Sequence, residues 1–281
     1  MTVYMRFPGG RLKALTLSYD DGVKQDQRLI AILNAHGIKA TFNINSGLFA
    51  ETPGSRGNRM TRPEALETYM NTPHEVAVHA LTHPPLDKLP IPSAVMEVME
   101  DRKNLEAMFG TIIRGMAYPQ GTYNDALVES LSSPGVVYSR TCISTHDFRL
   151  PTDWLRLTAT CHHKDERLFE LADKFLTETP LDLRINREPW LFYLWGHSYE
   201  FDHNSERNNW ERIEQFAEKM GGHEDVWYAT NIEIYDYMQA YNSLHFSLSC
   251  DRVFNPSAVP VWLECNRTLY CVQPGEQICI A

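Results

Sequence analysis

The fold is decided by the stretch Leu15-Thr16-Leu17-Ser18-Tyr19-Asp20-Asp21-Gly22, an apolar strand that ends in two adjacent carboxylates and a glycine. A second stretch, Glu75-Val76-Ala77-Val78-His79-Ala80-Leu81-Thr82-His83, runs from another strand into two histidines one helical turn apart. One carboxylate and two imidazoles form a three-ligand set that leaves a metal position open for water. The carboxylate beside that ligand is placed to act as a general base on the water. The two stretches therefore predict a hydrolytic metal site at strand ends.

Strand and helix signals alternate over most of the chain, which predicts parallel β/α units and hence a barrel or a doubly wound sheet. The residues with candidate chemistry follow predicted strands, and that is the face where β/α barrels carry their active sites. These residues are Asp20, Asp21, His79, Gln120 and His197. We expect strands at 14–18, 39–44, 75–78, 115–118, 190–195 and 226–229, and helices at 25–36, 63–69, 92–109, 167–176, 209–220 and 231–241.

The pattern changes near the C-terminus. Beyond about Ser243 the residues alternate between apolar and polar, as in 245–248 and 261–264, and turn signals stand at Asn266-Arg267 and Pro274-Gly275. We therefore predict a small β appendage over residues 243–281, following a (β/α) domain over residues 1–242.

Composition narrows the class of partner. The formal net charge is −10, from 26 basic and 36 acidic residues, so no basic stripe is expected to bind a nucleic-acid backbone. No stretch has the apolar length of a membrane span or the form of a leader, which favours a cytoplasmic address without membrane contact. The six cysteines form no C-x-x-C pair, and four of them lie in the last segment, a clustering typical of disulfides in secreted proteins. Without a leader, free thiols are favoured.

The ordered motifs resemble those of the polysaccharide deacetylases, the NodB-like group of carbohydrate esterase family four, over roughly residues 12 to 240. The family's first motif, (T/S)-(F/Y)-D-D-G, matches 18–22, and the resemblance makes Asp20 the general base and Asp21 a metal ligand. The second motif, H-x-x-x-H, matches His79 and His83, which complete the metal triad. The resemblance implies a distorted (β/α) barrel of this type. One divalent ion is expected, and zinc suits two imidazoles and a carboxylate.

The third motif of the family departs from the pattern here. Aligning on Pro119 and Gly121 puts Ala117 where the family has an arginine that supports the base. Arg114 and Arg140 are both candidates to replace that arginine through space, and the sequence does not choose between them. The resemblance also places Gln120 where a backbone N–H helps to hold the oxyanion.

A later motif supplies the general acid. The apolar run 191–196 ends in His197, and the resemblance makes this histidine the proton donor to the leaving amine. The motif that orients this histidine in the family is best matched by Asp153 and Trp154. Five aromatic residues beside the motifs suit stacking on a sugar ring or, equally, core packing: Tyr19, Tyr118, Trp154, Trp195 and Tyr199.

Plain structural explanations stand beside each assignment. Asp20 and Asp21 could cap a helix, His79 and His83 could form a buried hydrogen-bonded pair, and His197 could be a lone core histidine. A rival metal cluster is Cys161-His162-His163 with Asp165. We disfavour it, because adjacent histidines on a strand point to opposite faces.

Taken together, the sequence and the resemblance predict a metal-dependent hydrolase that cleaves a non-peptide C–N bond. The expected reaction removes acetyl groups from an N-acetylated sugar or oligosaccharide. The first alternative is a metal-dependent amidohydrolase acting on a non-sugar amide, cyclic ureide or imide. The second is a catalytically silent carbohydrate-binding protein. The sequence specifies no oligomeric state.

Overall fold

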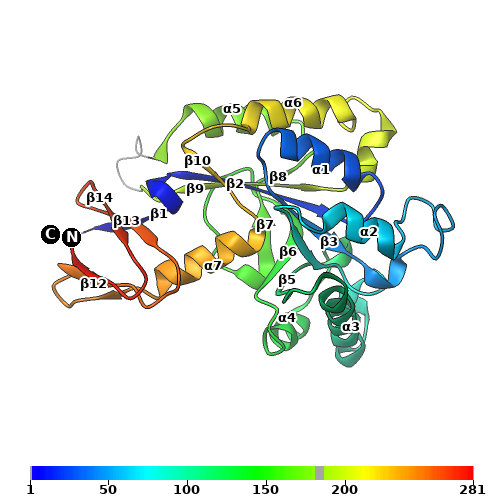
Figure 1. Cartoon of the computed structure of the whole chain (residues 1–281), viewed down its shortest axis with the longest axis horizontal. Coiled ribbons are helices and arrows are strands. Elements are labelled where there is room, and N and C mark those ends of the chain that lie inside the picture. Colours follow the sequence, from blue (N-terminus) through cyan, green and yellow to red (C-terminus); the bar gives the residue numbers. More distant parts are fainter. Residues whose placement is uncertain (1, 181–186, 281) are drawn as a thin grey trace.

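The structure is a computed structural model that describes residues 2–180 and 187–280 of the chain. A central parallel sheet is flanked by helices, with α1, α5 and α6 on one side and α3 and α4 on the other (Figure 1). The expected α/β class is thus confirmed. The helices are α1 (Asp26–Ala35), α2 (Arg62–Tyr69), α3 (Ile91–Phe109), α4 (Asp125–Ser132), α5 (Leu168–Thr177), α6 (Trp210–Met220) and α7 (Asn231–Asn242).

The strands of the main sheet are hydrogen-bonded in the order β7-β6-β5-β4-β3-β2-β9-β8, with β10 added beside β2. All of their pairings are parallel. The bounds are β2 (Lys13–Asp20), β3 (Ala40–Ile44), β4 (Glu75–Val78), β5 (Gly115–Ala117), β6 (Tyr138–Ser144), β7 (Leu157–Ala159), β8 (Cys161–His162), β9 (Trp190–Gly196) and β10 (Val226–Tyr228).

The two edge strands of this order, β7 and β8, are consecutive in the sequence. Strand β7 pairs with β6 and β8 pairs with β9, yet only Thr160 separates β7 from β8. The Thr160 amide donates to the Tyr193 carbonyl at 2.8 Å, and the Tyr193 amide donates to the Thr160 hydroxyl at 3.0 Å. The sheet therefore curls until one bent segment bridges its two edges, and the strand order of the described residues ends at β7 and β8.

Strand β2 lies at the centre, and every one of its residues is buried, as expected for a parallel strand covered on both faces. Strands β6, β7 and β8 and helix α4 are additions to the expected list. In β6 the residues Ser139, Arg140 and Thr141 are fully buried although they are polar. Hydropathy does not mark such a strand, because its buried side chains are not apolar.

The C-terminal strands form two small antiparallel sheets, β11-β12-β15 and β1-β13-β14. The N-terminal strand β1 thus lies beside the C-terminal residues, and both chain ends lie at the same side of the molecule (Figure 1). The side chains of this region pack into a core of their own. The bounds are β1 (Val3–Arg6), β11 (His245–Phe246), β12 (Arg252–Phe254), β13 (Val261–Cys265), β14 (Thr268–Val272) and β15 (Gln277–Cys279).

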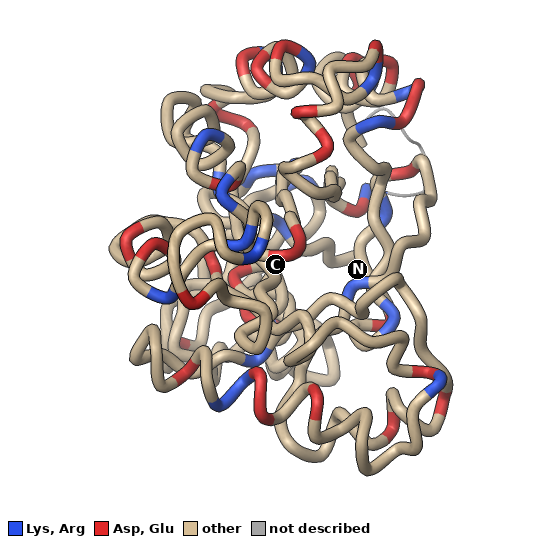
Figure 2. The backbone as a smooth tube through the Cα atoms, turned by 90° about the vertical axis from the view of Figure 1, so that its right-hand side faces the viewer, with Lys and Arg blue, Asp and Glu red and all other residues tan. Residues whose placement is uncertain are grey.

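All six cysteines lie at described positions, and all six are free thiols. In the described ranges, no helix combines the length and the apolar character needed to cross a bilayer. Acidic and basic positions are mixed along the elements seen in Figure 2, and no continuous basic stripe runs across that view.

Candidate active site

Parallel pairing brings the carboxyl ends of the strands together at one edge of the sheet. Tyr19 of β2 is in register with Gly196 of β9, and Asp20 is in register with Asn43 of β3. The next strand, β4, ends at Val78. Residues that immediately follow these strands are therefore neighbours in space, although more than a hundred positions separate some of them in the chain.

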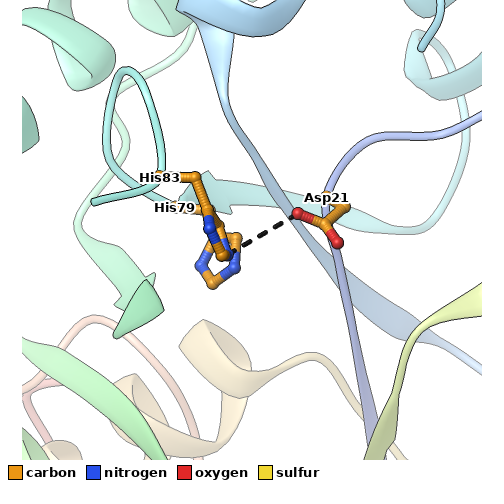
Figure 3. Close-up of side chains that lie close together, drawn as sticks. All are labelled: Asp21, His79 and His83. Carbon is orange, nitrogen blue, oxygen red and sulfur yellow. Dashed lines mark ion pairs between the residues drawn. The ribbon is translucent and has the colours of Figure 1, made fainter. Parts of the chain in front are cut away.

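The three expected metal ligands, Asp21, His79 and His83, do come together. Each offers one ligand atom, and these atoms lie within 4.8 Å of one another. His83 Nε2 is 3.8 Å from Asp21 Oδ1, and Figure 3 shows the two imidazoles beside the Asp21 carboxylate. Asp21 and His83 both adopt positive φ angles, 85° and 62°, which non-glycine residues seldom adopt. Such strained backbone clusters at functional sites.

The hydrogen bonding of His79 prepares it as a ligand. Its Nδ1 lies 2.9 Å from the Ala117 carbonyl oxygen, which can only accept, so the ring proton is on Nδ1. The lone pair is therefore on Nε2, a buried atom with no hydrogen-bond partner. Burial lowers the pKa of His79 to about 4, against the opposing effect of Asp20 and Asp21, and keeps the imidazole neutral. A neutral histidine fixed through its far nitrogen is a ready metal ligand.

Asp20, the expected base, is held from both sides. Its Oδ1 accepts a hydrogen bond from Asn43 Nδ2 at 2.8 Å, and its Oδ2 accepts one from Arg140 Nη2. Burial acts to raise the pKa of Asp20, but the Arg140 charge, followed by His79 and His197, lowers it to about 2. The carboxylate is therefore ionised at neutral pH.

Arg140 resolves the choice that the third motif left open. It projects from β6, is fully buried, and lies over the Trp195 ring at 4.4 Å. Arg114 instead pairs with Asp236 of α7 at 2.5 Å. Arg140 stands in register with Ala117 on the adjacent strand and is the one of the two arginines that contacts Asp20. Sequence order alone cannot reveal this, because it depends on the pairing of β5 with β6.

His197 lies between two carboxylates. Its Nε2 is 3.9 Å from Asp20 Oδ2, and its Nδ1 is 3.7 Å from Glu200 Oε1. Asp20 Oδ2 in turn lies 3.8 Å from His79 Nε2. The expected base therefore sits between one expected metal ligand and the expected acid.

Two further residues hold the site and were not anticipated, Asp101 and Arg59. Asp101 of α3 accepts the His79 amide at 3.1 Å, which fixes the backbone where β4 ends. Arg59, from the loop before α2, lies with Nη2 3.1 Å from Asp21 Oδ1 and with Nη1 3.2 Å from Asn45 Oδ1. In the sequence, an Arg/Gly-rich loop predicts an exposed segment. Only the structure shows that this loop folds over the site and brings Arg59 to Asp21.

Gln120 stands exposed in the turn Pro119–Gly121, directly after β5, with a φ of 56°. A Cβ at the next residue, Gly121, would lie 2.6 Å from Cys142 Sγ, and its φ is 68°. The backbone of this turn therefore requires glycine at 121 for lack of space as well as for conformation.

Asp153 and Trp154 make contacts other than the expected ones. Asp153 caps the turn Trp154–Arg156 by accepting the amides of Leu155 and Arg156, and it pairs with the Arg156 guanidinium at 2.9 Å. Trp154 packs edge-on against Tyr235 of α7 at 5.0 Å. The carboxylate that faces His197 Nδ1 is Glu200, at 3.7 Å.

Most of the aromatic candidates pack into the core. Tyr19, Tyr118 and Trp195 are buried: Tyr19 stacks on His163, and the Tyr118 hydroxyl donates to the Leu155 carbonyl. Tyr199 is only half-buried, and its ring lies 5.3 Å from that of His197. Of the five aromatic residues, Tyr199 is the one placed beside the expected acid with part of its surface open.

The rival histidine pair also gathers around a carboxylate. His162 Nε2 lies 3.3 Å and His163 Nε2 lies 2.9 Å from the same Glu200 oxygen. The expectation that the two histidines face opposite ways is wrong here. Strand β8 ends at His162, so strand alternation no longer governs His163.

The chain is similar to polysaccharide deacetylases in sequence and in fold. Residues 7–139 match the family model described as polysaccharide deacetylase. A putative polysaccharide deacetylase from Mycobacterium smegmatis is similar in structure, with 15% identity and a TM-score of 0.58, over 86% of this chain and 95% of that chain. A mutant of the peptidoglycan deacetylase PdaC from Bacillus subtilis has 16% identity and a TM-score of 0.51, over 83% and 94% of the two chains.

The deacetylase PplD from Streptococcus pyogenes, in complex with acetate, is 20% identical with a TM-score of 0.45, over 50% of this chain. The alignment spans 61% of that chain. No curated protein matches at the sequence level. The two structures with TM-scores above 0.5 show a shared fold and nothing beyond it.

Proposed function

We propose, from the match of residues 7–139 to the polysaccharide deacetylase family model, that this chain is a metal-dependent hydrolase of the acetamide bond in an N-acetylated sugar or oligosaccharide. One observation carries the proposal. The Asp20 carboxylate, held by Arg140 and Asn43, lies between the free Nε2 of His79 and the Nε2 of His197. Base, ligand and acid thus meet at one carboxylate.

We assign one divalent ion to Asp21, His79 and His83, with zinc as the ion that best suits two imidazoles and a carboxylate. The unpartnered Nε2 of buried His79 supports this assignment, because a buried polar atom without a partner is costly in a protein without a ligand there. When bound, the ion increases the acidity of water and polarises a carbonyl.

The residues of the chain then have separate tasks. Asp20 takes the proton of the attacking water, and Arg140 keeps that carboxylate ionised and oriented. The backbone N–H of Gln120 donates to the developing oxyanion. His197 gives a proton to the departing nitrogen, so that the C–N bond breaks with release of acetate and a free amine. Tyr199 contacts the sugar, and neither Asp153 nor Trp154 takes part.

The non-sugar amide remains the second candidate. The missing arginine of the third motif favours that candidate. In the structure, however, Arg140 supplies a guanidinium to Asp20 from another strand. This geometry favours the sugar substrate that the family name implies.

A substrate panel with metal control tests the proposal. Acetate or amine release is measured for N-acetylglucosamine, its short oligomers, a simple acetamide and a cyclic imide, using protein stripped with chelator and protein reloaded with zinc. We expect turnover of the acetylated sugars by the reloaded protein alone. Turnover confined to the imide would support the second candidate, whereas a metal-loaded protein that binds sugars without hydrolysis would contradict catalysis altogether.

A further inference from the structure

The carboxylate of Glu200 occupies an enclosed corner of the fold behind His197. Glu200 belongs to the turn Ser198–His203 that follows β9, while His162 ends the neighbouring strand β8. His162, His163 and Glu200 are all buried, with exposed fractions of 9%, 0% and 9%. Their ligand atoms lie within 4.8 Å of one another, the same spacing as in the Asp21 site.

The positions of the ring protons distinguish this cluster from a metal site. His162 Nδ1 accepts the Lys164 amide at 3.1 Å, so its proton is on Nε2, which faces Glu200. His163 Nε2 faces two oxygens, Glu200 Oε2 at 2.9 Å and Asn208 Oδ1 at 3.0 Å, so it also carries a proton. Burial lowers the pKa of both histidines, which are therefore neutral. The protonated Nε2 atoms of both rings lie within 3.3 Å of Glu200 Oε2, although that oxygen accepts no hydrogen bond of good geometry from the described residues.

Glu200 is consequently an anchored anion. Burial acts to raise the pKa of Glu200, but its interactions with His163, His197 and Lys164 lower it below the usual value. Its Oε2 faces His162 and His163, and this leaves Oε1 near Lys164 Nζ at 3.8 Å and His197 Nδ1 at 3.7 Å. Lys164 is largely exposed, so its charge is screened by solvent.

On the His197 ring, the nitrogen nearest Glu200 lacks a hydrogen-bond partner among the described residues. This nitrogen, Nδ1, is a buried atom, and it points to the Glu200 side, while Nε2 points to Asp20. The groups that face the ring are Asp20 from β2, His162 from β8, Trp195 from β9, and Tyr199 and Glu200 from the following turn.

We propose that Glu200, anchored by His162 and His163, is the positioning residue of His197. It attracts the proton to Nδ1 and thereby directs Nε2 toward Asp20. The inference rests on the proposed function, in which His197 Nε2 gives its proton to the leaving nitrogen as the C–N bond breaks. Glu200 neither gains nor loses a proton in that step, and its negative charge stabilises the imidazolium before transfer.

The main experiment is a double-mutant cycle between Glu200→Gln and His197→Ala, measured as kcat on an acetamide substrate with the zinc-loaded protein. Glutamine keeps the size of glutamate, but it is neutral and brings an N–H donor that can face Nδ1 and favour the wrong tautomer. We expect a loss of roughly 10²-fold in kcat, with KM little changed, and almost no further loss when His197 is already alanine. Full additivity of the two losses would overturn the proposal.

Two controls separate positioning from folding. Glu206→Gln, at an exposed carboxylate six residues further along, should leave kcat unchanged. Metal content should remain at one equivalent in Glu200→Gln. Loss of a second equivalent of metal in that variant would overturn the proposal, because it would make the cluster a metal site.

A spectroscopic measurement keeps the inference independent of activity. In ¹⁵N-histidine spectra of the wild-type protein, assigned with His197→Ala, His197 should show a protonated Nδ1. That signal should change in Glu200→Gln and not in Glu206→Gln. An unprotonated Nδ1 in the wild type overturns the role of Glu200 even if a variant fails to fold. A protonated Nδ1 in a protein that hydrolyses no amide would instead remove the proposed function and leave the contact standing.

Discussion

Two clusters in this molecule have the same composition and different chemistry. Asp21, His79 and His83 form one, and His162, His163 and Glu200 form the other, each with two imidazoles and one carboxylate within 4.8 Å. In the first, the far nitrogen of His79 donates to a carbonyl and leaves a lone pair facing the carboxylate. In the second, the Nε2 atoms of His162 and His163, which lie near the carboxylate, carry the ring protons. The partner of the far nitrogen of His79 and of His162, rather than the distance between ligands, is therefore the ground on which we propose a metal site for the first cluster and an anchor for the second.

The largest effect is expected on metal content and activity when a ligand of the first cluster is removed. This experiment tests most directly whether the two clusters differ. We predict about one equivalent of divalent metal per chain, under the one-site assignment, in protein purified without chelator. His79→Ala should lose the metal and, because the ion contributes several kcal/mol to transition-state stabilisation, at least roughly a thousandfold in activity. Elemental analysis and acetate release measure the two quantities.

The matched variant is His162→Ala, which truncates the corresponding side chain of the second cluster. Its metal content should equal that of the wild type. Two equivalents in the wild type, or metal loss in His162→Ala, would show that the two clusters are alike after all.

The base provides a somewhat smaller effect. Asp20→Asn removes the proton acceptor beside the first cluster while all three metal ligands remain, so we expect bound metal with a kcat reduced by about 10²–10⁴-fold. Arg140 is fully buried and would lose its charge partner, so the variant should also unfold at a lower temperature. Kinetics, elemental analysis and thermal unfolding check the three expectations. A metal-loaded variant with near-normal kcat would show that another group takes the proton.

The smallest effect on catalysis is expected at Asp26, whose hydrogen bonds connect the segment after Asp21 with the segment after His197. This buried carboxyl accepts hydrogen bonds from the Val23 amide, two residues after Asp21, and from the Ser198 hydroxyl, next to His197. Tyr69 donates a third. Burial, only partly opposed by these bonds, raises the pKa of Asp26 to about 7, so the folded protein binds its proton more tightly than the unfolded chain does.

The resulting pH dependence has a definite sign. The stabilisation from protonated Asp26 is fully present below the unfolded pKa, near 4, and is lost as the pH rises through about 7. The loss in the free energy of unfolding is at most about 4 kcal/mol over this window. Denaturant titrations of Asp26→Asn between pH 4 and pH 8 should show a weaker decline than the wild type. Exposed Glu218→Gln is the control, and an equal decline in wild type and Asp26→Asn would contradict the assignment.

The parts of the fold that the sequence predicted are those where local pattern and tertiary environment agree. Strand β2 is apolar because it is covered on both faces, and its end is marked by the two aspartates. Strand β6 escaped prediction because its central residues are polar side chains that pair inside the protein, such as Arg140 with Asp20. The division of the chain at residue 242 stays a proposal. The pairing of β1 with β13 indicates that the first strand packs with the C-terminal sheets.

By itself, the sequence determined the class of chemistry. Adjacent acids after one strand, two histidines after another and a histidine after a third are local features, and parallel pairing places strand ends together whatever the loops do. Only the tertiary structure decided which groups tune that chemistry. Arg140 reaches Asp20 from β6, Arg59 folds back on Asp21, and Glu200 meets His162, His163 and His197. The direction of a hydrogen bond at a buried ring nitrogen depends on neighbours far apart in the chain, and residue spacing carries no record of them.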